Sequence, residues 1–178
     1  SLAERMSREN MVGDIPGWWK RLGEGRPSIY FACDIGHAMT IRDEFRDAGI
    51  NADMIVDETD DDERESIRES MKAGYTQVVV NCDVLGEGVD WPFVSLIGLV
   101  RPTKRLRRYL QNAGRGMRAF LGKVDCILID HSGCVLYHGF PDIDREWPLS
   151  ENDNADKKNQ EKKEAESRPM QCVQCSAL

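Results

Sequence analysis

The sequence predicts an α/β domain in which a mainly parallel sheet lies between two layers of helices. Short apolar runs alternate with helical patterns between residues 28 and 130, and the runs 28–32 and 77–81 are apolar on both faces. Such strands are typical of a parallel sheet that helices cover on both sides. Parallel sheets bind ligands at the carboxyl ends of their strands. The loops to search therefore follow Ala32, Asn81, Val100 and Asp130.

The expected elements follow from periodicity and from residues that end helices. Strands are predicted at 28–32, 51–56, 77–81, 94–100 and 124–130. A helix follows the first strand, with apolar residues at helical spacing at Ala38, Ile41, Phe45 and Ala48. A second helix is predicted over 60–73, because the caps and acids at 59–63 suit a helix N-terminus. A basic helix is predicted from about Thr103 to Ala113.

Residues 9–22 fit two interpretations. They form either a helix that carries Trp18 and Trp19 or a linker with an aromatic anchor, because Gly13 and Pro16 interrupt the helical pattern. Further on, residues 150–168 are polar and charged with almost no apolar positions, which predicts a solvated linker.

The charge of the chain is acidic overall and basic in one place. Lysines and arginines number 24 against 31 acidic residues, for a net charge of −7, yet residues 101–118 hold basic side chains and no acidic ones. A concentrated basic segment on an acidic chain indicates one defined anion site rather than a general polyanion-binding surface.

Cysteine usage and hydropathy bear on the cellular compartment. Four of the six cysteines lie singly in or beside apolar runs, where buried free thiols are expected, and a reducing, cytoplasmic compartment fits this pattern. No apolar run approaches the roughly 20 residues of a membrane-spanning helix, so no membrane association is expected.

The segment 101–118 carries the best functional signal. Its apolar residues share one face of a helix, namely Leu106, Tyr109, Leu110 and Ala113. Gln111, Arg115 and Arg118 are spaced i, i+4 and i+7 and are predicted to share the opposite face. Gly114 and Gly116 are poor helix formers and suggest a close backbone approach to a neighbour or a ligand. A phosphate site is favoured over a solvated basic face, because arginine binds two phosphate oxygens at once.

Three motifs in order resemble those of the second ATPase lobe of superfamily 2 helicases. QNAGRGMR (111–118) resembles motif VI, NCDVLGEGVDWP (81–92) resembles motif V, and SIYFACDIGHA (28–38) resembles motif IV, while Arg64 matches an arginine that usually precedes motif V. The combination is most similar to RadD-type DNA repair helicases and their phage relatives, over about residues 26–148. This resemblance implies a RecA-like three-layer sandwich with a mainly parallel central sheet.

The resemblance implies roles for residues near a nucleotide. Arg115 and Arg118 would reach the γ-phosphate of ATP held by an N-terminal lobe, as catalytic arginine fingers, and Gln111 would link this site to that lobe. Gly88 and Asp90 match positions that contact the nucleotide.

Other matched positions contact nucleic-acid phosphates in the family, and DNA is the nucleic acid expected here. These are Cys33, Asp34, His37, Asn81, Cys82 and Arg101. Two departures from the family pattern stand out. Cys82 stands where many members have threonine, so the resemblance does not supply a hydroxyl contact there. Val56-Asp57-Glu58 replaces a His-Gly or Asp-Gly pair, which weakens the expectation of a close backbone approach.

Other family motifs are not in the sequence. There is no G-x-x-x-x-G-K-[ST] loop to hold the phosphates and no DE-x-[HD] strand end to hold Mg²⁺. ATP and Mg²⁺ would therefore be bound mainly by the first lobe, on a longer chain, and this chain alone is expected to be inactive.

The expected organisation has four parts. Residues 1–25 would join to the N-terminal lobe, 26–148 form the RecA-like domain, 149–170 form a polar linker, and 171–178 begin a cysteine-rich module. Cys172 and Cys175 form a C-x-x-C pair that supplies two of the four ligands of a Zn²⁺ site. The string His131, Cys134 and His138 is instead interpreted as part of a small hairpin.

Two alternative functions remain open at this point. One is a non-catalytic nucleic-acid-binding domain that keeps the fold, and the other is the motor portion of a restriction enzyme subunit. A P-loop lobe upstream in the gene would exclude the first, and a nuclease motif would identify the second.

Overall fold

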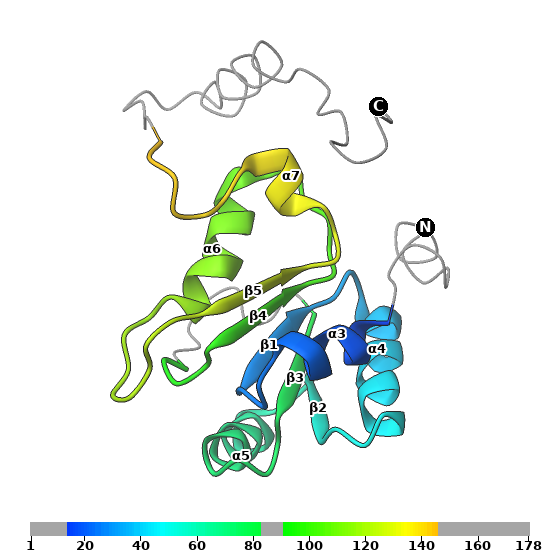
Figure 1. The fold of residues 1–178 in the computed structure, drawn as a ribbon. Helices are drawn as coiled ribbons and strands as arrows, with labels where there is room; N and C mark the ends of the chain where they lie inside the picture. The colour runs from blue at the N-terminus through cyan, green and yellow to red at the C-terminus, as the bar shows by residue number, and fades with distance from the viewer. Residues whose placement is uncertain (1–13, 83–90, 146–178) are drawn as a thin grey trace. The chain divides into compact units, whose positions relative to one another are not determined.

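The parallel sheet is the framework of the domain. The computed structural model describes residues 14–82 and 91–145, and its described residues as far as Pro141 belong to one compact unit. Within these residues a five-stranded, fully parallel sheet has the order β2-β3-β1-β4-β5 (Figure 1). The strands are β1 (Ser28–Phe31), β2 (Ala52–Ile55), β3 (Val78–Asn81), β4 (Leu96–Leu99) and β5 (Ile127–Asp130). The predicted α/β class is confirmed.

Burial explains why the strands are apolar on both faces. Every residue of β1, β3 and β4 is buried, and Tyr30 of the central strand has no exposed surface. Ser28 lies opposite Val78 on one side and Leu96 on the other, so β1 is hydrogen-bonded along both edges. A polar residue in the middle of these strands would lose its contact with water on either face.

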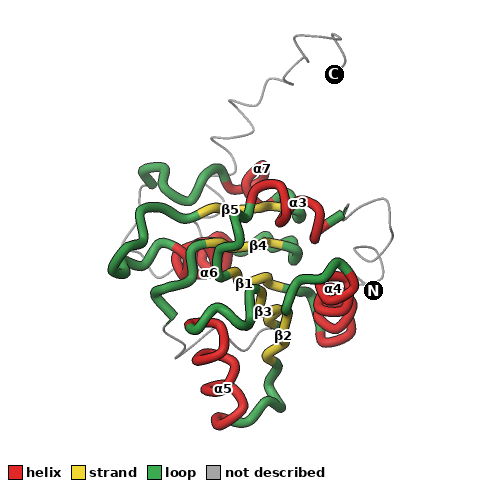
Figure 2. The backbone as a smooth tube through the Cα atoms, turned by 60° about the horizontal axis from the view of Figure 1, so that its bottom comes forward, coloured by secondary structure: helices red, strands yellow, loops and turns green. Residues whose placement is uncertain are grey.

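Helices cover the two faces of the sheet. On one face α3 (Ile15–Leu22) and α4 (Ile35–Asp47) pack against a core that includes Tyr30. On the other face α5 (Asp61–Lys72), α6 (Leu106–Gly116) and α7 (Cys134–His138) pack against a core that includes Ile29. Figure 1 and Figure 2 show α4 on the opposite side of the strands from α5 and α6. The three-layer arrangement predicted from the resemblance is confirmed.

Two helix starts follow from local capping. The Asp34 carboxylate accepts a hydrogen bond from the His37 amide at 2.8 Å and starts α4. The Asp60 carboxylate accepts from the Glu63 amide at 2.7 Å and starts α5. Both side chains satisfy amides that have no partner within the helix. The helix predicted over 60–73 therefore begins and ends within a residue of its predicted bounds.

The segment before the first strand is a helix rather than a bare linker. Asp14 caps α3 by accepting from the Gly17 amide at 2.7 Å. Trp19 is 5% exposed, and its indole donates to the Ser28 hydroxyl at 2.7 Å. Trp18 is 42% exposed and lies under the Arg21 guanidinium. Of the two tryptophans, Trp19 therefore fixes α3 on the sheet.

Three elements differ most from the predictions. Strand β5 begins at Ile127 rather than 124, and Val124 is 96% exposed, so this apolar residue does not mark a buried strand. Helix α6 is shifted toward the C-terminus and includes both glycines. The predicted hairpin after β5 is wrong, because Cys134–His138 is the short helix α7.

The single cysteines in the described part are free thiols. Cys134 is buried, whereas Cys33, Cys82 and Cys126 are half-buried. Burial raises the pKa of the Cys126 and Cys134 thiols, which favours their neutral form. Among the described residues, no helix is both long and apolar enough to cross a membrane.

Candidate functional site

The two ends of the sheet hold different sets of predicted site residues. Because all the strands are parallel, their carboxyl ends form one edge, here called the carboxyl edge, and their beginnings form the amino edge. Helix α6 starts after the carboxyl end of β4 and ends against Ile97 of β4 and Cys126, which precedes β5. The C-terminal end of α6 therefore lies near the amino edge.

Gly116 allows this close contact. A Cβ atom at position 116 would lie 2.6 Å from the Ile97 Cγ1 atom and even closer to the Cys126 sulfur, distances that real side chains do not adopt. A Cβ atom at Gly114, by contrast, would meet no described atom within 4 Å beyond the backbone of its own helix. The prediction of a close backbone approach is thus confirmed for Gly116, where the neighbour is the protein itself.

The three predicted catalytic residues do not share one helical face. Arg115 is in the last turn of α6 and only 8% exposed, whereas Gln111 is exposed. Arg118 is exposed and lies beyond the helix, which ends at Gly116 with Met117 as its C-cap. The prediction of a common face opposite the core is wrong, because Arg115 is buried whereas Gln111 is exposed, and the chain leaves the helix before Arg118.

Cys33, Asp34 and His37 form a local hydrogen-bonded unit at the carboxyl edge. The Cys33 amide donates to His37 Nδ1 at 3.3 Å, and the Asp34 carboxylate caps α4. His37 is 4% exposed, and burial lowers its pKa, an effect that Asp34 partly opposes. The lowered pKa favours the neutral imidazole, and the hydrogen bond from Cys33 makes Nδ1 its acceptor. The unit fixes the first turn of α4 at the point where β1 ends.

Asn81, Cys82 and Arg101 lie on neighbouring strand ends of the same edge. Asn81 is 1% exposed, and its carbonyl accepts from the Ala32 amide at 2.9 Å. The Cys82 amide donates to the Ile55 carbonyl at 3.3 Å, so this amide is already used within the sheet. Arg101 is half-buried and lies just after β4. Since β3, β1 and β4 are adjacent, the structure brings these residues and Cys33 to one edge.

Arg64 holds the loop after β2. Its Nε donates to the Thr59 carbonyl at 2.8 Å, and its Nη2 donates to the carbonyls of Val56 and Asp57, each at 3.2 Å. The Thr59 hydroxyl also accepts from the Val56 amide at 3.0 Å. The segment Val56-Asp57-Glu58, which departs from the family pattern, is therefore part of a closed turn. Arg64 fixes this turn, and in the sequence only the family resemblance pointed to Arg64.

The residues after β5 serve packing. The His138 Nε2 atom lies 2.7 Å from the Thr103 carbonyl, and its ring stacks on Tyr109 at 5.1 Å between centroids. The Tyr109 hydroxyl donates to the Gly139 carbonyl at 2.9 Å, so α6 and α7 are tied together. The Asp130 carboxylate accepts from the amide of Val135 at 2.7 Å and so connects the end of β5 to the start of α7. In the two described ranges, no group of three or more His, Cys, Asp or Glu side chains is placed to hold a metal ion.

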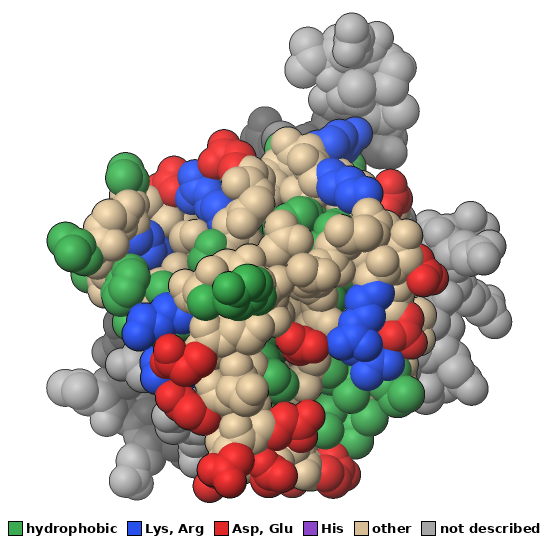
Figure 3. All heavy atoms as spheres, turned by 90° about the horizontal axis from the view of Figure 1, so that it is seen from below, with side chains coloured by type: hydrophobic (Ala, Val, Ile, Leu, Met, Phe, Trp, Pro, Cys, Tyr) green, Lys and Arg blue, Asp and Glu red, His purple; other side chains and the backbone are tan. Residues whose placement is uncertain are grey.

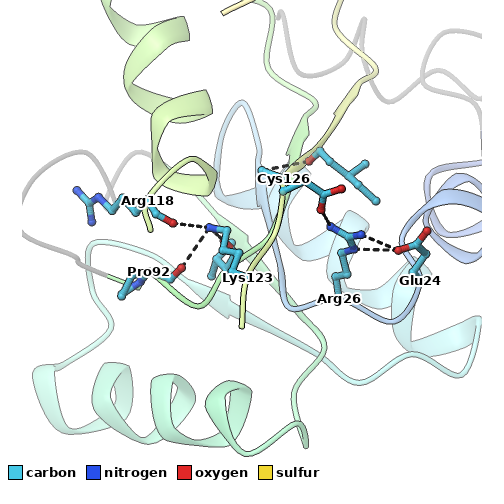
Figure 4. Close-up of polar contacts among 9 residues, drawn as sticks. Glu24, Arg26, Pro92, Arg118, Lys123 and Cys126 are labelled. Carbon is cyan, nitrogen blue, oxygen red and sulfur yellow. Dashed lines mark hydrogen bonds and ion pairs between the residues drawn. The ribbon is translucent and has the colours of Figure 1, made fainter. Parts of the chain in front are cut away.

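Lys123 was not singled out by any pattern in the sequence. Its ammonium donates to the carbonyls of Pro92 at 3.1 Å, Val94 at 2.5 Å and Arg118 at 2.9 Å (Figure 4). In Figure 4 the guanidinium of Arg118 points away from Lys123, while its carbonyl points toward it. The contacts with Pro92 and Val94 span 31 and 29 residues of sequence, which no local pattern reveals.

The surface charge is mixed outside the predicted site. Figure 3 shows a face on which acidic side chains gather along the lower border, while basic and further acidic side chains are scattered over the rest. On α5, Arg68 pairs with Glu65 and Glu69 at 2.6 Å each, so part of the basic charge is paired locally. The basic charge of this helix is thus partly neutralised by its own acidic side chains.

Four predicted residues lie outside the described part of the chain. These are Gly88 and Asp90, which fall within 83–90, and Cys172 and Cys175, which fall beyond 145.

Comparisons with known proteins agree with the three-layer fold. Residues 21–120 match the family described as the helicase conserved C-terminal domain. The putative ATP-dependent helicase IRC3 of Saccharomyces cerevisiae is 36% identical over 108 residues, covering 61% of this chain and 16% of that protein. A 51.5 kDa protein of a Lactococcus phage is 29% identical over 170 residues, covering 96% of this chain and 37% of that protein.

A solved structure shows the same fold. The Escherichia coli DEAD-box protein SrmB, in its complex with the regulator of ribonuclease activity A, superimposes with a TM-score of 0.59 at 24% identity, over 70% of this chain and 72% of that one. The chain spans less than two fifths of either curated relative described above. With its sheet order and matched segment, this chain belongs to the helicase conserved C-terminal domain family, the second lobe of superfamily 2 helicases.

Proposed function

We propose that this chain is the second motor lobe of an ATP-dependent superfamily 2 DNA helicase or translocase. ATP and Mg²⁺ would be bound mainly by an N-terminal lobe of the same full-length chain. The observation that carries the proposal is the separation of two residue sets, with Arg115 and Arg118 toward the amino edge and the nucleic-acid candidates at the carboxyl edge. This separation would allow one lobe to contact ATP and nucleic acid at the same time.

The two arginines suit transfer of the γ-phosphoryl group. In that reaction negative charge develops on the phosphate oxygens, and an arginine finger accelerates related reactions by about 10³–10⁵-fold. Arg115 lies in the last turn of α6, where the helix backbone packs on the sheet at Gly116, so the position of its main chain is fixed before ATP arrives. Gln111 would link this end to the first lobe, and Gly88 and Asp90 would contact the nucleotide, as the resemblance implies.

The carboxyl edge would contact the phosphates of DNA. The candidates are Cys33, Asp34, His37, Asn81, Cys82 and Arg101. Arg101 supplies the positive charge in this set, while the hydrogen-bonded unit of Cys33, Asp34 and His37 fixes the shape of the loop. Because the Cys82 amide is used by Ile55, a contact from this residue would come from its side chain. Contacts of this kind position a motor on the backbone without reading sequence.

The remaining segments would have the roles predicted from the sequence. Residues 26–148 would be the motor lobe, with 1–25 as the connection to the first lobe and 149–170 as a linker. Cys172 and Cys175 would supply half of a Zn²⁺ site in a module that begins at residue 171, because a structural zinc site needs four ligands. Metal analysis of the full-length protein and of its Cys172→Ser variant tests this role.

A comparison of two proteins tests the proposed function. The full-length protein should hydrolyse ATP faster when DNA is present, whereas the 178-residue chain alone should show no DNA-stimulated hydrolysis, since its sequence holds no P-loop. RNA of equal length serves as the control nucleic acid. Absence of nucleic-acid stimulation in the full-length protein would refute the motor assignment and favour a non-catalytic binding domain.

A further inference from the structure

Lys123 fastens the loop that joins α6 to β5. The apolar residues Leu121 and Val124 of this loop are each 96% exposed. The Lys123 ammonium reaches back across the amino edge to the carbonyls of Pro92 and Val94, just before β4. A second attachment at the base of the loop is the ion pair of Arg26 with Asp125. Figure 4 shows both attachments.

The Lys123 ammonium has a carbonyl acceptor for each of its three N–H donors. A protonated lysine has three N–H donors and no acceptor, and Lys123 meets three carbonyl oxygens at 2.5–3.1 Å. Burial lowers the pKa of Lys123, an effect that the nearby Cys126 thiol partly opposes. A lysine placed in this way joins three backbone positions, two of them far from it in sequence.

One of these positions is the main chain of Arg118. Arg118 lies beyond the last residue of α6, and the C-cap amide of Met117 donates to the Gly114 carbonyl at 3.2 Å. After that bond the helix no longer fixes the chain. The bond from Lys123 to the Arg118 carbonyl, at 2.9 Å, therefore ties Arg118 to the segment that leads into β4.

We propose that Lys123 is a positioning residue that fixes the main chain of Arg118, so that the Arg118 guanidinium meets the γ-phosphate in the geometry required for hydrolysis. This inference rests on the proposed function. It adds to the motor site a residue that touches neither nucleotide nor nucleic acid. Transition-state contacts depend steeply on position, and a displacement of about 1 Å costs on the order of 10²-fold in rate.

The test uses the full-length protein and the change Lys123→Met, which keeps most of the length of the side chain and removes its donors. We expect kcat for DNA-stimulated ATP hydrolysis to fall by about 10–100-fold, with KM for ATP and the Kd for DNA within about twofold of wild type. Lys20→Met is the matched control, since Lys20 also donates to a backbone carbonyl, that of Ala48 at 2.6 Å, away from the site. Its kcat should stay within about twofold of wild type.

A double-mutant cycle separates positioning from a general structural role. If Lys123 acts through Arg118, adding Lys123→Met to Arg118→Ala should lower kcat by no more than about twofold beyond Arg118→Ala alone. A further loss as large as that of the single Lys123 variant would overturn the proposal, as would a Lys123→Met kcat equal to that of Lys20→Met. If Arg118→Ala itself has wild-type turnover, the arginine assignment fails, and the positioning role fails with it.

Discussion

Gly116 of α6 lies so close to Ile97 of β4 that a Cβ atom at position 116 would be 2.6 Å from the Ile97 Cγ1 atom. The helix that carries Arg115 therefore packs with its backbone directly on the sheet. The helix ends at Gly116, where this contact lies, and the chain then continues toward Arg118.

Gly116→Ala should destabilise the domain. The added methyl group must displace Ile97 or Cys126, and overpacking of this kind costs about 1–3 kcal/mol. Gly114→Ala is the matched control, because a methyl group there meets open space within a helix and should be neutral or stabilising by about 0.5–1 kcal/mol. Urea unfolding of the purified chain measures both. Equal stability of the two variants would contradict the close contact at Gly116.

His37 should make stability depend on pH. Burial lowers its pKa in the folded chain, so in the range below about 6.5 the unfolded chain binds a proton that the folded chain resists. This contribution to stability is fully present above pH 6.5 and is lost as the pH falls toward the lowered pKa. The variant His37→Asn keeps an acceptor for the Cys33 amide and does not titrate.

The measurement for His37 is the free energy of unfolding at pH 7.5 and 5.5. Wild type should lose more stability between these values than His37→Asn does. The same loss in both proteins would show that His37 is not the group responsible.

Arg101→Ala should weaken DNA binding by the full-length protein and change its salt dependence. If Arg101 contacts one phosphate, the slope of log affinity against log salt should become shallower by about one. Arg68→Ala, on α5, removes an arginine that pairs with Glu65 and should leave the slope unchanged. Titrations at several salt concentrations decide the matter. An unchanged slope in Arg101→Ala would remove this residue from the nucleic-acid contacts.

The sheet and most helices were predictable because their signals are local. The three consecutive valines of β3 indicate a buried strand, and the capped, acidic start of α5 indicates a helix N-terminus. Each signal lies within a few residues of sequence. The motifs likewise placed Cys33, Asn81 and Arg101 at strand ends, and the parallel sheet brings those ends together.

The end of α6 was not predictable in the same way. Gly116 is a poor helix former, yet it lies within the helix, and a glycine is required there because Ile97 and Cys126 leave no room for a side chain. Arg115 in the same turn of the helix is buried, and the three carbonyls around Lys123 come from two separate segments. Such contacts are properties of the assembled domain rather than of any window of sequence.

The central claim is that this lobe supplies arginines to ATP, and steady-state ATP turnover of full-length Arg118→Ala and Arg115→Ala tests it most directly. With saturating DNA, each variant should turn over about a hundredfold more slowly than wild type, or slower still, because charge on the transferring phosphate loses its partner. DNA affinity should remain nearly intact, and Arg68→Ala should match wild type. Wild-type turnover in either arginine variant would contradict its role as a finger.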